Sequence, residues 1–145
     1  MRHKLLHQSG GQRTYAVVLK AGDEVTACLK RFMAAENIAA AQLTAIGALS
    51  DVVLLYFDWD KKDYIRIPIK EQVEVASLIG DIAEDPSGQP ALHIHLVVGK
   101  RDGSAMAGHL GEAHVRPTLE VIVTESPAHL RKKKDPESGL ALIEL

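Results

Sequence analysis

The most constraining feature of this sequence is a strand, a tight turn and a returning strand between Leu92 and Gly111. Two histidines, His93 and His95, lie two positions apart in the first strand, so both side chains point to one face of the sheet. A third, His109, lies between two glycines on the returning strand. The other face of the first strand takes the apolar residues Leu92, Ile94, Leu96 and Val98. The segment therefore predicts an antiparallel hairpin that can bring three imidazoles to one place.

The length of the turn decides whether the third histidine faces the other two. A two-residue loop would turn His109 away, because a slip of one residue reverses the facing of a strand. A three-residue loop, 101–103, pairs Lys100 with Ser104 and sets His95 directly opposite His109. We favour the second loop, since it needs a positive φ at its last position, where the sequence has a glycine.

Three neutral imidazoles at one point are a typical ligand set for zinc or a similar divalent metal. We therefore expect His93, His95 and His109 to be metal ligands, with the fourth tetrahedral position open to water or substrate, as in catalytic zinc sites. Ordinary half-buried histidines on a polar sheet face are the alternative. A carboxylate near the metal could accept a proton or support a ligand. Glu120 is a better candidate for this role than Glu112, because its place in an apolar β segment suggests partial burial. A solvent-facing residue or an ion pair between subunits is the alternative for Glu120.

One segment of the chain has helical periodicity. Apolar residues recur on one helical face at Val25, Cys28, Leu29, Phe32 and Met33. Asp23 is the expected N-cap, and Asn37 is expected to end the helix. The single cysteine falls on the apolar face, so we expect it to be buried, and a lone cysteine excludes an intrachain disulfide.

The rest of the chain predicts strands and turns. Strands are expected at 13–19, 43–49, 52–58, 64–69, 73–82, 118–125 and 139–145, with a basic, turn-rich loop from Leu130 to Pro136. Within its strand, Gly47 suggests a bulge or a close backbone approach. Neighbouring strands are joined as hairpins, so the sequence predicts an α+β fold. We expect a curved, largely antiparallel sheet with one main helix packed on a face, in one domain of residues 1–145.

Composition limits the classes of function. The chain has 145 residues, a formal net charge of −2 and a pI of about 6.4, so its surface as a whole does not attract nucleic acid. A single basic run could contact DNA, at Arg131, Lys132, Lys133 and Lys134, and a solvated loop is its alternative. No apolar run approaches the roughly 20 residues of a membrane span, and there is no signal-peptide pattern. With one cysteine, these features predict a cytoplasmic protein.

The remaining histidines and exposed aromatic residues have simpler interpretations. We expect surface positions for His3, His7, His114 and His129. Tyr56 and Trp59 are expected to pack in the core or between subunits rather than to stack on bases.

The order of these motifs resembles the PPC domain family, also called DUF296, which plants and prokaryotes share. The matching stretches are 45–49, 73–82, 93–112, 117–121 and 139–142. The resemblance implies an α+β fold assembled as a homotrimer, with a metal, usually zinc, on His93, His95 and His109. Plant members carry separate Arg-Gly-Arg-Pro AT-hooks that enter the DNA minor groove, and this sequence has none.

The resemblance also implies a DNA-binding or regulatory label. The rival functions are a metal-dependent, hydrolase-like enzyme acting on a small molecule and a trimeric module that binds a metal or small ligand.

Overall fold

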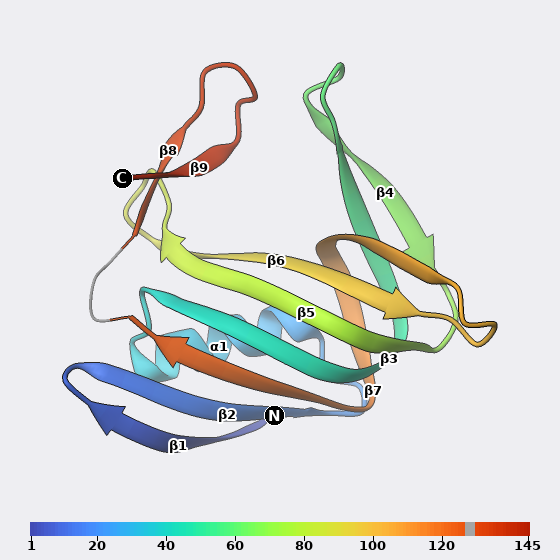
Figure 1. Cartoon of the computed structure of the whole chain (residues 1–145), viewed down its shortest axis with the longest axis horizontal. Coiled ribbons are helices and arrows are strands. Elements are labelled where there is room, and N and C mark those ends of the chain that lie inside the picture. The colour runs from blue at the N-terminus through green and yellow to red at the C-terminus, as the bar shows by residue number, and fades with distance from the viewer. Residues whose placement is uncertain (127–129) are drawn as a thin grey trace.

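The computed structural model describes residues 1–126 and 130–145. Its elements are β1 (Arg2–Ser9), β2 (Gln12–Lys20), α1 (Val25–Glu36), β3 (Ala41–Asp58), β4 (Asp63–Ile69), β5 (Val73–Glu84), β6 (Pro90–Gly99), β7 (Ala105–Glu125), β8 (Arg131–Lys134) and β9 (Ala141–Glu144). The described strands join one sheet, and α1 lies against one of its faces (Figure 1). Among the described residues the strand pairs are antiparallel, apart from a short parallel contact between β5 and β8. The expected α+β class with one helix is confirmed.

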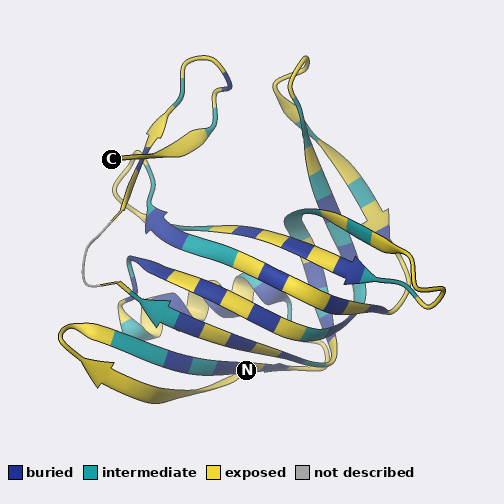
Figure 2. Cartoon of the chain, in the orientation of Figure 1, coloured by how far each residue is buried: buried dark blue, intermediate teal, exposed yellow. Residues whose placement is uncertain are grey.

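The core lies between α1 and the sheet, and the predicted apolar face of the helix is buried, Cys28 included. Buried and exposed residues alternate along much of the central strands, as Figure 2 shows, whereas β1 and β9 are exposed throughout. The helix ends at Asn37, which has a φ of 54°, as predicted. The predicted N-cap was wrong by one residue, because the Asp23 carboxylate accepts instead from the amino terminus of Met1 at 2.7 Å. The cap is Glu24, whose carboxylate accepts hydrogen bonds from the backbone N–H groups of Thr26 and Ala27.

Two pairs of predicted segments prove to be continuous strands. β3 contains both segments expected between 43 and 58, and β7 contains the returning strand of the histidine hairpin as well as 118–125. The predicted close approach at Gly47 is confirmed, because a Cβ there would lie 2.3 Å from the carbonyl oxygen of Thr118. β6 pairs with β5 and with β7, which both pair with β3, so these four strands form a closed circuit.

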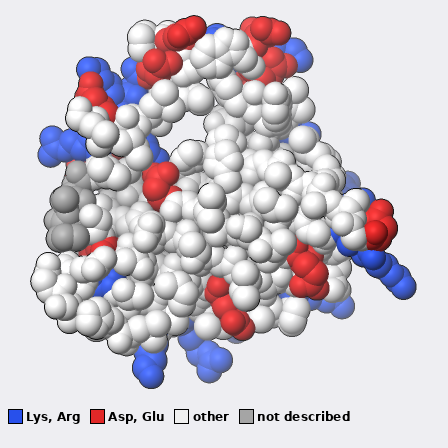
Figure 3. Space-filling model, in the orientation of Figure 1, with Lys and Arg blue, Asp and Glu red and all other residues white. Residues whose placement is uncertain are grey.

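The C-terminal segment differs from the prediction. Residues 131–134 form β8, which pairs with β9, and are not a loop. Lys132 alone among the four residues of β8 is buried, and its burial is hidden in a run of like charges. The β8–β9 hairpin and the β3–β4 hairpin project from the same side of the sheet (Figure 1). The molecule is open between them in Figure 3.

Several predicted surface positions are confirmed. His3 and His7 are exposed, with His3 beside Glu36, while His114 is partly exposed beside Asp51. His129 lies outside the described residues. The two aromatic residues do not pack in the core, since Tyr56 is 63% and Trp59 is 52% exposed. In the described part of the chain, no helix is both long enough and apolar enough to cross a membrane.

Candidate metal centre

The turn of the histidine hairpin has the predicted length. Lys100 donates its N–H to the carbonyl oxygen of Ser104 at 2.8 Å, and Gly103 has a φ of 83°. His95 therefore lies directly opposite His109 in the ladder of β6 and β7. The three-residue loop is confirmed, and with it the facing of the third histidine.

The glycines on either side of His109 allow β7 to lie against β3. A Cβ at Gly108 would come within 2.9 Å of the carbonyl oxygen of Leu55, and one at Gly111 within 2.9 Å of that of Val53. Real Cβ atoms essentially never approach backbone atoms this closely. A side chain at either position would push the strand that carries the third imidazole away from its neighbour.

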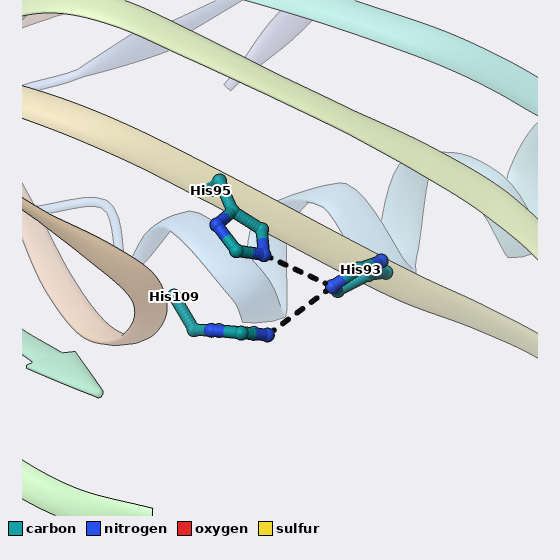
Figure 4. A group of neighbouring side chains, drawn as sticks. All are labelled: His93, His95 and His109. Carbon is teal, nitrogen blue, oxygen red and sulfur yellow. Dashed lines mark hydrogen bonds between the residues drawn. The ribbon is translucent and has the colours of Figure 1, made fainter. Parts of the chain in front are cut away.

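The three imidazoles meet through their Nε2 atoms (Figure 4). His93 Nε2 lies 3.2 Å from His95 Nε2 and 3.3 Å from His109 Nε2. A tetrahedral zinc ion with Zn–N bonds of about 2.0–2.1 Å separates two ligand nitrogens by about 3.3–3.4 Å. The two measured distances therefore fit two edges of a zinc coordination tetrahedron, the ligand atoms of all three residues lie within 4.8 Å of one another, and the donor set fits a divalent transition metal.

A carboxylate orients one of the imidazoles from behind. Asp81 Oδ2 lies 3.1 Å from His93 Nδ1, and since a carboxylate can only accept, Nδ1 carries the proton in this contact. The lone pair of His93 is thereby left on Nε2, which faces the other two histidines. A carboxylate behind a metal-binding histidine is a common arrangement and raises the basicity of the ligand. Asp81 lies directly opposite His93 in the β5–β6 ladder.

The surroundings keep two of the imidazoles neutral. Burial, followed by the nearby imidazoles of His95 and His93, lowers the pKa of His109 to about 4. Burial and then His93 also lower the pKa of His95. Tyr64 Oη lies 3.4 Å from His109 Nε2, and burial raises the pKa of this phenol, so it stays protonated. Neutral imidazoles are the form that a metal ion requires.

A pocket of about 380 Å³ lies over the histidines, between the two projecting hairpins. Tyr64 of β4 lines one side, and Lys132 of β8 with residues 140–142 line the other. The side chain of Lys132 is only 6% exposed, and its Nζ lies 2.7 Å from Asp81 Oδ1. The site thus combines three convergent imidazole nitrogens, a protonated phenol, a buried cation and an apolar wall, which can enclose a small molecule.

The predicted carboxylate does not join the site. Glu120 is exposed, lies opposite Val18 and Ile46 in the sheet, and does not line the pocket. Its expected partial burial was wrong, because its neighbours Leu119 and Val121 face the core and strand alternation turns the residue between them outward. Glu112 is exposed as well.

The basic run is not a free cationic patch. Arg131, Lys132 and Lys133 each lie within 3.2 Å of an acidic partner, respectively Glu84, Asp81 and Glu144. Three of the four predicted DNA contacts are thus ion-paired, and one of the three is buried.

Three residues of the site were not predicted. Asp81 had a signal, because a hairpin closed at 85–89 places it opposite His93. Tyr64 and Lys132 had none, since their places depend on how two separate hairpins fold toward the histidines.

Comparison with known proteins decides the family. A family model of the Plants and Prokaryotes Conserved (PCC) domain matches residues 6–127. The chain belongs to this family. The resemblance drawn from the motifs, under the name PPC, is therefore confirmed.

Three solved structures are similar to this chain over nearly its whole length. The metal-containing protein AF0104 of Archaeoglobus fulgidus is 32% identical, with 91% of this chain and 93% of that one covered and a TM-score of 0.83. A plant- and prokaryote-conserved protein of Pyrococcus horikoshii is 31% identical, and the match covers 99% of this chain and 95% of that one with a TM-score of 0.84. A Bacteroides thetaiotaomicron protein named "putative DNA binding protein" is 26% identical, and the match covers 98% of this chain and 96% of that one with a TM-score of 0.85.

A curated relative is much longer than this PCC chain. The bifunctional protein GlmU of a Synechococcus strain is 28% identical over 138 residues, which are 94% of this chain but 21% of that protein. The chain thus spans about a fifth of the length of this relative.

Proposed function

We propose that this PCC-family protein binds a divalent transition metal, zinc foremost, through His93, His95 and His109, and that it acts on a small molecule in the pocket above. The observation that carries the proposal is the 3.2–3.3 Å spacing of Nε2 atoms that converge beneath that pocket. Three protein ligands are typical of catalytic rather than structural zinc sites, because structural sites use four. The proposal is a metal-dependent, hydrolase-like centre.

The ion, when bound, would supply Lewis acidity to a water molecule or to a carbonyl or phosphoryl oxygen. The chain supplies the rest of the chemistry. Asp81 accepts from the Nδ1–H of His93 and fixes the orientation of that ring. The Tyr64 hydroxyl, close to His109, is a proton donor at neutral pH. The apolar residues between Leu140 and Leu142 shield one side of the pocket from water.

A DNA-binding function has less support in this chain, although some relatives carry that name. Double-stranded DNA is held by cations that are free to neutralise phosphates. The basic run of β8 offers few such free cations, because Arg131, Lys132 and Lys133 already have acidic partners.

We also propose that the protein assembles as a homotrimer, as its family resemblance implies. Support comes from the sheet face opposite α1, where Ile46 is 62%, Ile79 is 57% and Ile122 is 42% exposed. Ile79 and Ile122 both lie opposite Thr44, so they are near neighbours on one face. The same face is largely without charged side chains in Figure 3. Apolar surface of this kind commonly marks a site of association.

Native mass spectrometry of tag-free protein tests both proposals, because it reports subunit number and bound metal together. We expect a trimer with three zinc-sized ions, and the loss of those ions in His95→Ala. His7→Ala is the matched control, since His7 is exposed and remote from the group, and it should keep the metal. A zinc-supplied protein without bound metal, or equal loss in both variants, would refute the site.

The catalytic and assembly parts need separate controls. Hydrolysis of ester and phosphoester substrates should require added zinc and vanish in His95→Ala but not in His7→Ala, and turnover that survives metal removal would refute a metal-dependent centre. Ile122→Glu should dissociate the trimer, whereas Ile143→Glu should not, because Ile143 is equally exposed but lies on β9. If both variants remain trimers, this sheet face is not the trimer interface.

A further inference from the structure

One carboxylate oxygen of Asp81 is shielded from water. Its Oδ2 contacts His93 Nδ1, whereas its Oδ1 has almost no accessible surface. The one partner found for Oδ1 among the described residues is Lys132 Nζ at 2.7 Å, a distance that makes an ion pair although its angles fall short of a hydrogen bond. A buried carboxylate oxygen is strongly disfavoured without a compensating cation. The position of Asp81 behind His93 therefore depends on Lys132.

Lys132 itself comes from a distant part of the chain. It lies on β8, whose ladder pairing with β5 in the described part of the chain is limited to Glu84 and Arg131. Within the described residues, the ion pair with Asp81 is the buried link between this hairpin and the histidine site. The same hairpin supplies the wall formed by residues 140–142. One side chain thus joins the pocket wall to a metal ligand.

We propose that Lys132 is a positioning residue, which acts through Asp81 to hold His93 in its metal-binding orientation and docks the C-terminal hairpin over the site. This inference rests on the proposed metal function. Without the ammonium group, the buried Oδ1 of Asp81 would lose its cation, so the carboxylate turns away from this position and His93 loses its acceptor. Because the two ends of a linkage are reciprocal, metal binding also strengthens the docking of the β8–β9 hairpin.

The first test compares zinc affinities, measured by competition with a chromophoric chelator. Lys132→Met should weaken zinc binding by about 10- to 100-fold, the usual effect of removing the support of a metal ligand. Lys132→Arg, which keeps the charge, should restore most of the affinity. Lys133→Met is the matched control, since Lys133 is 71% exposed and pairs within the hairpin with Glu144. Equal affinities in Lys132→Met and Lys133→Met would overturn the proposal.

A double-mutant cycle separates positioning from mere support of the hairpin. Because Lys132 acts through Asp81, Lys132→Met should have no further effect on zinc affinity in an Asp81→Asn background. An equal loss in both backgrounds would overturn the positioning role. Hydrogen exchange of residues 131–134 and 141–144 should be slowed by zinc in the wild type but not in Lys132→Met.

The outcomes also distinguish this inference from the proposed function. A wild type that binds no zinc refutes the metal site, and nitrogen NMR of the metal-free protein then decides the inference alone. The Nδ1-protonated form of His93 should be held in the wild type and in Lys133→Met, and released in Lys132→Met and Asp81→Asn. Retention in all four proteins would refute the role of Lys132. Should Lys132→Met not fold, Lys132→Gln takes its place.

Discussion

Gly80 of β5 lies opposite Ile94 of β6, beside the proposed metal ligands. A Cβ at this position would lie 2.5 Å from the carbonyl oxygen of His93 and 3.0 Å from Ile94 Cγ1. Ordinary contact begins near 3.4 Å, so Gly80→Ala requires the two backbones to separate by about 0.9 Å. Overpacking of this kind costs about 1–3 kcal/mol, and a backbone obstacle belongs at the upper end. The lower entropy of the unfolded alanine chain offsets about 0.4–1 kcal/mol. We expect a net loss of about 2 kcal/mol in the free energy of unfolding.

The same displacement moves a proposed ligand. Metal sites tolerate errors of about 0.5 Å, so Gly80→Ala should also lower zinc affinity by at least tenfold. Gly99→Ala is the matched control, because Gly99 lies on the same strand as His93 and the nearest atom to its added Cβ is 4.0 Å away. Urea unfolding and chelator competition on both variants measure the two effects. Equal stability and equal affinity in the two variants would refute the reasoning.

Three further outcomes follow from the structure. Zinc at 100 times its dissociation constant should stabilise the wild type by about 2.7 kcal/mol in urea unfolding, an effect that EDTA reverses and that His95→Ala lacks. Asp51 raises the pKa of His114, so this pair stabilises the fold below the ordinary histidine pKa and ceases to do so as pH rises through the raised value. His114→Gln should therefore cost up to about 0.5 kcal/mol at pH 6 and nothing measurable at pH 8.5, because the pair is partly exposed, and an equal cost at both values would contradict this. Replacing the cap, Glu24→Ala, should lower stability by about 1 kcal/mol, whereas the exposed Glu112→Ala should not.

The hairpin that carries the three histidines could be predicted from sequence because every determinant is local. Strand alternation sets the facing of His93 and His95, and the need for a positive φ at Gly103 sets the register of His109. The same alternation, applied to the residues around Glu120, would have turned that side chain outward. The prediction of partial burial was wrong because the apolar neighbours of Glu120 were taken as a sign that Glu120 itself is buried.

The pocket could not be predicted in the same way. Its walls come from β4, β8 and β9, whose positions depend on contacts between segments far apart in the chain. In β8, the four consecutive cations suggested a solvated loop. The burial of Lys132 within a strand was therefore missed. Its partner there, Asp81, is distant from Lys132 in sequence, so nothing near Lys132 indicated the ion pair.

The proposed ligands are close in sequence, and this affects the order in which the fold can assemble. His93 and His109 are 16 positions apart, whereas Arg13 and Glu125, which join β2 to the end of β7, are 112 apart. Loop-closure entropy favours the shorter contact by about 1.7 kcal/mol. The histidine hairpin can therefore form, and capture an ion, before the outer strands of the sheet find their partners. An ion bound at that stage would act as a folding nucleus and speed the folding of the whole chain, not only stabilise its final state.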